Sequence, residues 1–371
     1  MMRAAGAALL LALLAACSTG TPRPKPAELQ AITPSLAVRQ VWQARLGSID
    51  FPVQVHAGAG SVTLASSEGT VLELDAGSGR EIWRLALGTP LAAGVGSDGS
   101  TAAVVTRSNE LVALQKGQVL WRQRLGAQAF SAPLVAGGRI FLLSADRAVS
   151  AYDGVSGRRL WLQQRTGDEP LVLRQAGVML AVGDTLVVGI GGRLFGLDPQ
   201  NGLSRWSAPI ATPRGINEIE RLVDLVGPAA RQGRQVCARA FQAAVACIDA
   251  DRGALRWSRT ADGQVGLAAD ERLLFGIEAD GLVQAWRLAD GEKVWSHEQL
   301  RFRDLTAPLV IGRSVAVGDL QGFVHLLSRE DGKVLARLST DGTAVASRPV
   351  VAGNTLVVVT RSGGVYGFAP Q

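Results

Sequence analysis

From about residue 37 to the end of the chain, apolar residues come in short runs separated by turns rich in glycine, aspartate and serine. Short apolar runs bounded by such turn residues are typical of β-strands. In one representative unit the pattern predicts four consecutive strands, at residues 131–135, 139–144, 148–152 and 158–163. Similar units follow along the chain, which predicts an all-β protein built from four-stranded antiparallel sheets.

Seven of the eight tryptophans repeat at intervals of 38 to 51 residues, and these are Trp42, Trp83, Trp121, Trp161, Trp206, Trp257 and Trp295. All but the first stand four residues after a glycine. Gly332 continues the series, with Ala336 in the tryptophan position. A repeat of about 40 residues with a glycine turn and an aromatic residue is typical of a propeller blade. Eight repeats therefore predict an eight-bladed β-propeller.

The turn before each tryptophan has its own chemistry. An aspartate stands four residues before the glycine in four blades, at Asp75, Asp153, Asp198 and Asp249. Its carboxylate can accept backbone N–H bonds within the turn, and the glycine can adopt a positive φ. We expect each tryptophan to pack between neighbouring blades while its indole N–H finds an acceptor. The recurrence of the aspartate favours a structural role over metal binding.

Each end of the chain supplies only part of a blade. The run from Val38 to Leu46 has no complete blade before it, and the segment from Ala344 to Phe368 supplies three strands without an outer one. We predict that the N-terminal strand completes the last blade and closes the ring, which leaves only short sheet edges. Residues 37–371 are thus predicted to form one propeller.

The first 36 residues indicate export and lipid anchoring. Residues 1–16 combine a basic start with an apolar stretch too short to span a bilayer, as in a signal peptide. Leu14-Ala15-Ala16-Cys17 resembles the bacterial lipobox, so Cys17 is predicted to be acylated, for example with palmitate, after cleavage. The alternative is an ordinary signal peptide with a chance cysteine. In lipoproteins with such a signal, an aspartate directly after the cysteine retains the protein in the inner membrane, so Ser18 favours the outer membrane.

Residues 17–36 contain four prolines and are predicted to form an extended tether. At about 3.1 Å per residue, the tether would reach at most about 65 Å from Cys17 to Val38. The net charge of +6 is spread along the chain without a block of like charges. Together with the export signal, this charge pattern argues against nucleic acid as a partner.

Candidate catalytic and cofactor motifs are weak. Residues 94–99 match G-x-G-x-x-G but lie inside a predicted blade, where glycines make hairpin turns rather than a dinucleotide site. His56, His297 and His325 fall in separate blades without metal-ligand spacing. The sequence therefore predicts no metal, no cofactor and no small-molecule substrate.

Cys237 and Cys247 flank a predicted hairpin at residues 241–243. The periplasm would permit a disulfide between them. A slip of one residue in the strand register would instead put them on different faces of the sheet. The sequence leaves open a disulfide or two small buried thiols.

The blade turns, such as residues 74–83, resemble the tryptophan-docking repeats of pyrroloquinoline-quinone (PQQ) dehydrogenases. Together with the lipobox, the proline-rich tether and the single ring, they are similar over the whole chain to the BamB family of outer-membrane lipoproteins. This resemblance implies a non-enzymatic scaffold of the β-barrel assembly (BAM) complex, anchored to the cell outer membrane and facing the periplasm. Such a scaffold binds the POTRA domains of BamA and other subunits of the complex, and it assists β-barrel folding and insertion.

Two segments resemble the family's BamA-binding loops. Residues 171–174 match an L-x-L-R stretch, and residues 218–224 match E-I-[DE]-R-L-x-D. The resemblance implies that the contact residues are Leu171, Leu173, Arg174 and Asp224. The chain departs from the family at Val226, where an acidic residue is expected. The alternative role for the two leucines is strand core.

Two other functions remain open. PQQ-dependent dehydrogenases share the predicted fold, but they use an adjacent cysteine pair, calcium-binding acids and a catalytic aspartate. This chain has no Cys-Cys pair, and a fold does not carry an activity without its site. An enzyme is therefore not expected. The remaining alternative is an envelope lipoprotein that binds glycan or another protein through the ring face.

Overall fold

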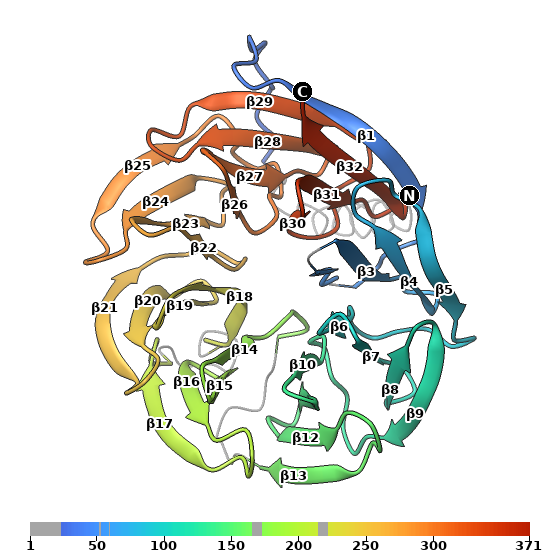
Figure 1. Cartoon of the computed structure of the whole chain (residues 1–371). Helices are drawn as coiled ribbons and strands as arrows, with labels where there is room; N and C mark the ends of the chain where they lie inside the picture. Colours follow the sequence, from blue (N-terminus) through green and yellow to red (C-terminus); the bar gives the residue numbers. More distant parts are fainter. Residues whose placement is uncertain (1–23, 52, 59, 165–172, 214–221) are drawn as a thin grey trace, which may run out of the picture.

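The computed structural model describes residues 24–371 apart from residues 52, 59, 165–172 and 214–221. All the elements that it describes are β-strands, which form eight four-stranded antiparallel sheets around a central axis (Figure 1). These sheets are the blades of an eight-bladed β-propeller, so the predicted fold class is confirmed. No helix in the described ranges is long and apolar enough to cross a membrane.

Within each blade the first strand lies nearest the axis and the last strand lies at the outside of the ring (Figure 1). Blades 1 to 4 consist of β2 (His56–Ala57), β3 (Ser61–Ala65), β4 (Thr70–Asp75) and β5 (Glu81–Ala86); β6 (Gly96–Ser97), β7 (Thr101–Val105), β8 (Glu110–Gln115) and β9 (Gln118–Arg124); β10 (Leu134–Ala136), β11 (Arg139–Leu143), β12 (Val149–Asp153) and β13 (Arg159–Gln163); and β14 (Met179–Val182), β15 (Thr185–Ile190), β16 (Arg193–Leu197) and β17 (Ser204–Pro209).

The second half of the ring repeats this arrangement. Blades 5 to 8 consist of β18 (Leu225–Gln232), β19 (Gln235–Ala240), β20 (Ala244–Asp249) and β21 (Ala254–Thr260); β22 (Ala268–Ala269), β23 (Leu273–Ile277), β24 (Val283–Arg287) and β25 (Lys293–His297); β26 (Leu309–Ile311), β27 (Ser314–Gly318), β28 (Phe323–Ser328) and β29 (Val334–Ser339); and β30 (Val350–Ala352), β31 (Thr355–Val359), β32 (Gly364–Pro370) and β1 (Val38–Arg45).

Ring closure follows the sequence prediction. The N-terminal strand β1 pairs antiparallel with the C-terminal strand β32, from Val38 opposite Pro370 to Arg45 opposite Gly364. The two ends of the described fold therefore share blade 8 (Figure 1). The apolar core lies in layers between neighbouring blades, and one such layer joins Val62 of blade 1 to Val357 of blade 8. Burial of these layers is what holds the ring together.

Each repeated tryptophan packs on the repeated glycine of the next blade. At Gly157 a Cβ atom would lie 2.6 Å from Cδ2 of Trp121, and the backbone φ is +71°. The indole N–H of Trp121 donates to the carbonyl of Gly154 at 3.0 Å. Packing between blades is therefore confirmed, and the glycine is required both for its φ and for its lack of a side chain.

The same docking runs around the ring with two variations. Trp83 packs on Gly117 but donates its N–H to Glu73 of its own blade. Trp206 packs on Gly253, and its buried N–H has no acceptor among the described residues. The turn aspartates behave as predicted: Asp153 Oδ1, for example, accepts the backbone N–H of Ser156 at 2.7 Å. The hydrogen bonds from Ser156 hold the pKa of Asp153 below its usual value.

Cys237 and Cys247 form a disulfide, which is one of the two alternatives that the sequence left open. They lie directly opposite each other on β19 and β20, with Cα atoms 4.0 Å apart. The predicted turn at residues 241–243 joins these strands, and Gln242 adopts a positive φ of 48° within it. The register that brings the two cysteines together depends on this turn, which is why the sequence could not decide between the alternatives.

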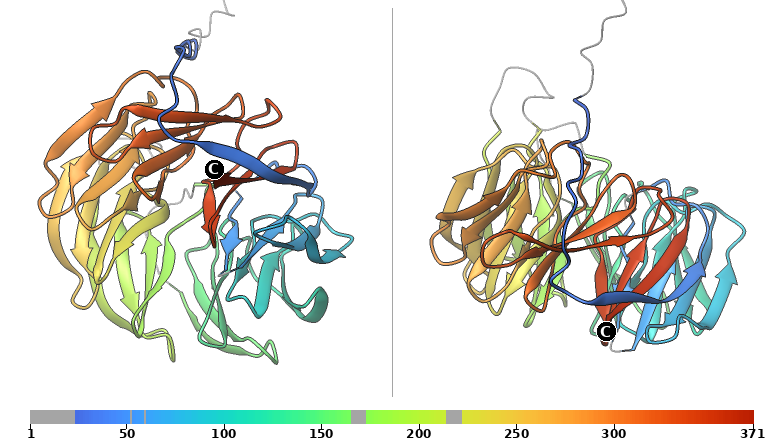
Figure 2. Two further views of the ribbon diagram at one scale, coloured as in Figure 1. Left: turned by 45° about the horizontal axis from the view of Figure 1, so that its top comes forward. Right: turned by 90° about the horizontal axis from the view of Figure 1, so that it is seen from above.

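The described part of the predicted tether lies against blade 7 instead of extending away from the ring. Figure 2 shows this blue segment passing over the outer strands of blade 7 before it enters β1. The backbone N–H groups of Ala27 and Ser35 donate to carbonyls of Arg301 and Leu335 at 2.9 and 2.8 Å. Three arginines of the ring donate to carbonyls of the segment: Arg303 to Ala27, Arg313 to Ser35 and Arg337 to Gln30.

This contact shortens the expected reach of the tether. The ring already binds the chain at Ala27. The span from Cys17 to Ala27 is at most about 31 Å at about 3.1 Å per residue, which is half of the reach expected from the sequence. Leu36 packs in the same apolar cluster as Ala336, the position where the tryptophan is missing. Cys17 itself lies outside the described residues.

A buried polar cluster lies beneath this segment in blade 7. Asp319 Oδ2 accepts a hydrogen bond from Arg303 Nε at 2.8 Å and lies 2.9 Å from His325 Nε2. All three side chains are buried. Burial lowers the pKa of His325 despite the neighbouring Asp319, and burial also lowers the pKa of His297. Both rings are therefore neutral at neutral pH.

We expect the melting temperature to fall as the pH is lowered from about 7.5 to about 5.5. Below the ordinary histidine pKa of about 6.5, the unfolded chain takes up protons that His297 and His325 do not take up in the folded ring. The two histidines therefore cost no stability above the ordinary histidine pKa. Below it, the free energy of unfolding decreases by at most about 1.4 kcal/mol per pH unit for each histidine. Fluorimetric melting curves measure the slope. His325→Gln keeps a donor for Asp319 and should flatten it, and a constant melting temperature would contradict this account.

Candidate partner-binding site

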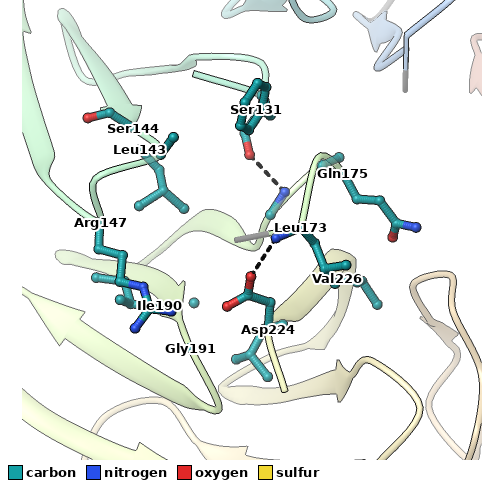
Figure 3. A pocket seen from close by; sticks show the side chains of 16 residues that line it. Ser131, Leu143, Ser144, Arg147, Leu173, Gln175, Ile190, Gly191, Asp224 and Val226 are labelled. Carbon is teal, nitrogen blue, oxygen red and sulfur yellow. Dashed lines mark hydrogen bonds between the residues drawn. The ribbon is translucent and has the colours of Figure 1, made fainter. Parts of the chain in front are cut away.

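The described residues of the two partner-binding segments lie on adjacent loops of blades 4 and 5. Leu173 and Arg174 belong to the loop between β13 and β14, and Asp224 directly precedes β18. Figure 3 shows Leu173 and Asp224 side by side. Leu171 and residues 218–221 lie outside the described residues, so the fourth predicted contact residue is not placed.

Asp224 connects the two loops. Its Oδ2 atom accepts the backbone N–H of Leu173 at 2.8 Å (Figure 3). Its own carbonyl accepts the backbone N–H of Phe241, in the turn after β19, at 2.9 Å. A charged acceptor makes a stronger hydrogen bond than a neutral one. The resemblance implied that Asp224 contacts the partner, and the structure adds an intramolecular role in which it positions Leu173.

Arg174 lies above an aromatic ring of blade 3. Its guanidinium carbon is 5.2 Å from the centroid of Phe130, and the side chain is exposed. A cation–π contact at an exposed site contributes about 0.5–1 kcal/mol. This contact restrains the guanidinium on the surface while its hydrogen-bond donors can still reach a partner, and Arg is well suited to bind carboxylates and carbonyls.

The loop that carries Leu173 and Arg174 is fixed on both sides. Toward blade 3, the backbone N–H of Gly177 donates to Ser131 Oγ at 2.7 Å. Toward blade 5, the backbone N–H of Gly227 donates to the carbonyl of Ala176 at 2.7 Å. A surface held in this way loses little conformational entropy when a partner binds.

A small pocket of about 50 Å³ lies beneath this loop, between blades 3, 4 and 5. Leu173, Asp224, Ser131 and Arg147 are among the residues that line it (Figure 3). Leu173 is half-buried and lies outside the strands, so the alternative of strand core does not apply to it. The pocket offers space beside Leu173 for a small apolar group of a partner.

Sequence reasoning missed the contribution of blade 3. Phe130, Ser131 and Arg147 match no partner-binding motif, although Ser131 opens the recognisable Ser-Ala-Pro strand start. Val226, at the position where the family's acidic residue was expected, is buried with 2 % exposure. Where the family has an acidic residue, this chain therefore has an apolar side chain that lies in the interior.

The weak cofactor motif is a hairpin turn, as predicted. Residues 94–99 include β6, and Asp98 Oδ1 accepts the backbone N–H groups of Ser100 and Thr101 at 2.9 and 2.8 Å. Across the described ranges, no group of three or more His, Cys, Asp or Glu side chains is arranged to hold a metal ion.

Comparison with known proteins places the chain in one family. The family model described as "Outer membrane protein assembly factor BamB" matches residues 67–297. A protein of that name from Burkholderia pseudomallei is 38% identical over 369 residues, which cover 98% of this chain and 97% of the relative. The crystal structure of BamB from Moraxella catarrhalis matches with a TM-score of 0.81 at 27% identity, covering 90% of this chain and 99% of that chain. A quinohemoprotein alcohol dehydrogenase from Pseudomonas putida HK5, at 13% identity and a TM-score of 0.71, covers 90% of this chain and 76% of that chain and shares the fold alone.

Proposed function

Because the chain belongs to the BamB family of outer membrane protein assembly factors, we propose that it binds the POTRA domains of BamA through the loops that carry Leu173, Arg174 and Asp224. Leu171 is proposed as a further contact. In this role the ring is a non-catalytic scaffold that holds BamA and other subunits of the complex while β-barrel proteins fold and insert. We further propose that an acylated Cys17 anchors it to the outer membrane, on the periplasmic side.

The observation that carries this proposal is the hydrogen bond between Asp224 and the backbone of Leu173. It joins two segments that are far apart in the sequence into one surface. That surface combines an apolar group, a restrained guanidinium and a carboxylate, and Arg and well-packed apolar groups are frequent binding hot spots. The closed ring behind it supplies a rigid support, so binding requires little rearrangement.

A pull-down from detergent-solubilised membranes tests the proposed function. The full chain with a C-terminal tag should recover a BamA-like barrel protein, and mass spectrometry of the same sample should find a lipid on Cys17. Recovery of no barrel protein would count against the scaffold role. A free, unmodified Cys17 would contradict the proposed anchor without affecting the proposed contact.

A further inference from the structure

The centre of the ring holds a cavity of about 640 Å³ to which all eight blades, or the loops leading into them, contribute. This volume lies within the range of about 300–1,000 Å³ that is usual for small-molecule sites. Its wall is mixed in character. Gln54, Gln175 and Gln264 provide amide groups from blades 1, 4 and 6, and Met179 and Val350 provide apolar surface.

One partly buried cation in this wall has no counter-charge among the described residues. Arg348 lies in the loop between β29 and β30, borders the cavity and is partly buried. No residue in the described part of the chain accepts a hydrogen bond from its guanidinium or forms an ion pair with it. Burial lowers the pKa of Arg348, and no neighbouring carboxylate offsets that effect. A charge that is partly withdrawn from water without a partner loses part of its solvation, so an uncompensated arginine that borders a cavity points to an anion supplied from outside.

The other charged groups of the wall do not neutralise Arg348. Asp50 is the acidic side chain that borders the cavity, and both of its oxygens accept hydrogen bonds from Arg107 Nη2 at 2.7 Å. Burial lowers the pKa of His56, which is therefore neutral at neutral pH. Arg361 is exposed and adds a second positive charge. The wall formed by the described residues is thus positive, which favours anions.

We propose that the central cavity binds a small organic carboxylate and that Arg348 is the residue that holds its carboxylate group. The planar guanidinium matches a carboxylate in a two-bond geometry. The amides of Gln54, Gln175 and Gln264 can bind neutral polar groups elsewhere on the ligand. A monocarboxylate carries one charge and matches Arg348, the partly buried cation of the wall, whereas a phosphate dianion would bring a second charge that only the exposed Arg361 could face.

Calorimetric titration of the full chain in detergent, with the monocarboxylate succinamate as the probe, tests this proposal. We expect saturable binding at one site per chain. Arg348→Gln should weaken it by about tenfold or more, because a hydrogen-bonded charge pair is lost. Arg39→Gln is the matched control, because Arg39 is exposed on β1, the outer strand of the same blade, and does not border the cavity. We expect it to change the affinity by less than about threefold. The neutral analogue succinamide and inorganic phosphate should both bind more weakly than succinamate.

Folding of the variants is checked by their melting temperature without ligand. Arg348→Gln removes an uncompensated charge, so its melting temperature should equal or exceed that of the native chain. Arg348→Lys keeps the charge but loses the planar fork, and its affinity should fall between the other two. The proposal is overturned if succinamate does not saturate the native chain, if it binds Arg348→Gln and Arg348→Lys as tightly as the native chain, or if phosphate or succinamide binds as tightly.

Discussion

Replacing Gly157 by alanine is expected to lower the free energy of unfolding by about 2–5 kcal/mol. The backbone φ of +71° is unfavourable for any residue with a side chain, and the new Cβ atom would lie 2.6 Å from Trp121 Cδ2. The indole cannot move aside freely, because its N–H is bonded to the carbonyl of Gly154. Equilibrium denaturation followed by tryptophan fluorescence measures the loss.

Gly138→Ala is the matched control for this prediction. Gly138 lies in the same blade with the same φ of +71°, but nothing stands within 4 Å of the Cβ position. Its replacement should therefore cost only the backbone conformation, about 1–2 kcal/mol. Equal losses for the two variants would mean that the tryptophan does not need the space above Gly157 and would remove docking as the link between blades.

Replacing Asp224 by alanine is expected to weaken binding of the BamA POTRA domains by about 2–4 kcal/mol. The variant removes a charged group from the proposed surface, and it also removes the acceptor that holds the backbone N–H of Leu173. The neighbouring Arg174 would lose its fixed position with it. Loss of the hydrogen bond to Leu173 should cost the ring about 1 kcal/mol of stability. Calorimetric titration with purified POTRA domains measures the affinity.

Asp224→Asn separates the two contributions of this side chain. Asparagine keeps an oxygen that can accept the Leu173 N–H but carries no charge, so it should retain more affinity than alanine does. Asp198→Ala is the control, because Asp198 accepts the backbone N–H of Gln200 at 2.7 Å in a turn at the other end of blade 4. Its removal should leave POTRA binding unchanged. Native affinity in Asp224→Ala would place the partner surface elsewhere on the ring.

The architecture could be predicted because the chain repeats one sequence unit of about 40 residues. The spacing from Trp83 to Trp295 defines the blades, and the incomplete units at the two ends define how the ring closes. The partner of each tryptophan could not be predicted in the same way. Trp121 meets Gly157 only because successive blades are stacked at a fixed rotation, and no local pattern encodes that contact.

Two segments that resemble a known family indicated where the candidate site lies, but they did not indicate its geometry. The bond between Asp224 and Leu173 depends on how two loops approach each other. No sequence motif indicates that Phe130 lies beneath Arg174. Prolines predicted an extended N-terminal segment, but its contacts with Arg303 and Arg337 join residues from opposite ends of the chain, which only the closed ring brings together.

The most direct test of the account is the affinity of the native chain and Arg174→Glu for BamA POTRA domains. Arg158→Glu serves as the control, since Arg158 is an exposed arginine in the turn between β12 and β13, at the opposite end of blade 3 from Phe130. We predict that Arg174→Glu weakens binding by about tenfold or more, while Arg158→Glu binds like the native chain and both variants melt at the native temperature. Native affinity in Arg174→Glu would contradict the proposal that these loops bind BamA.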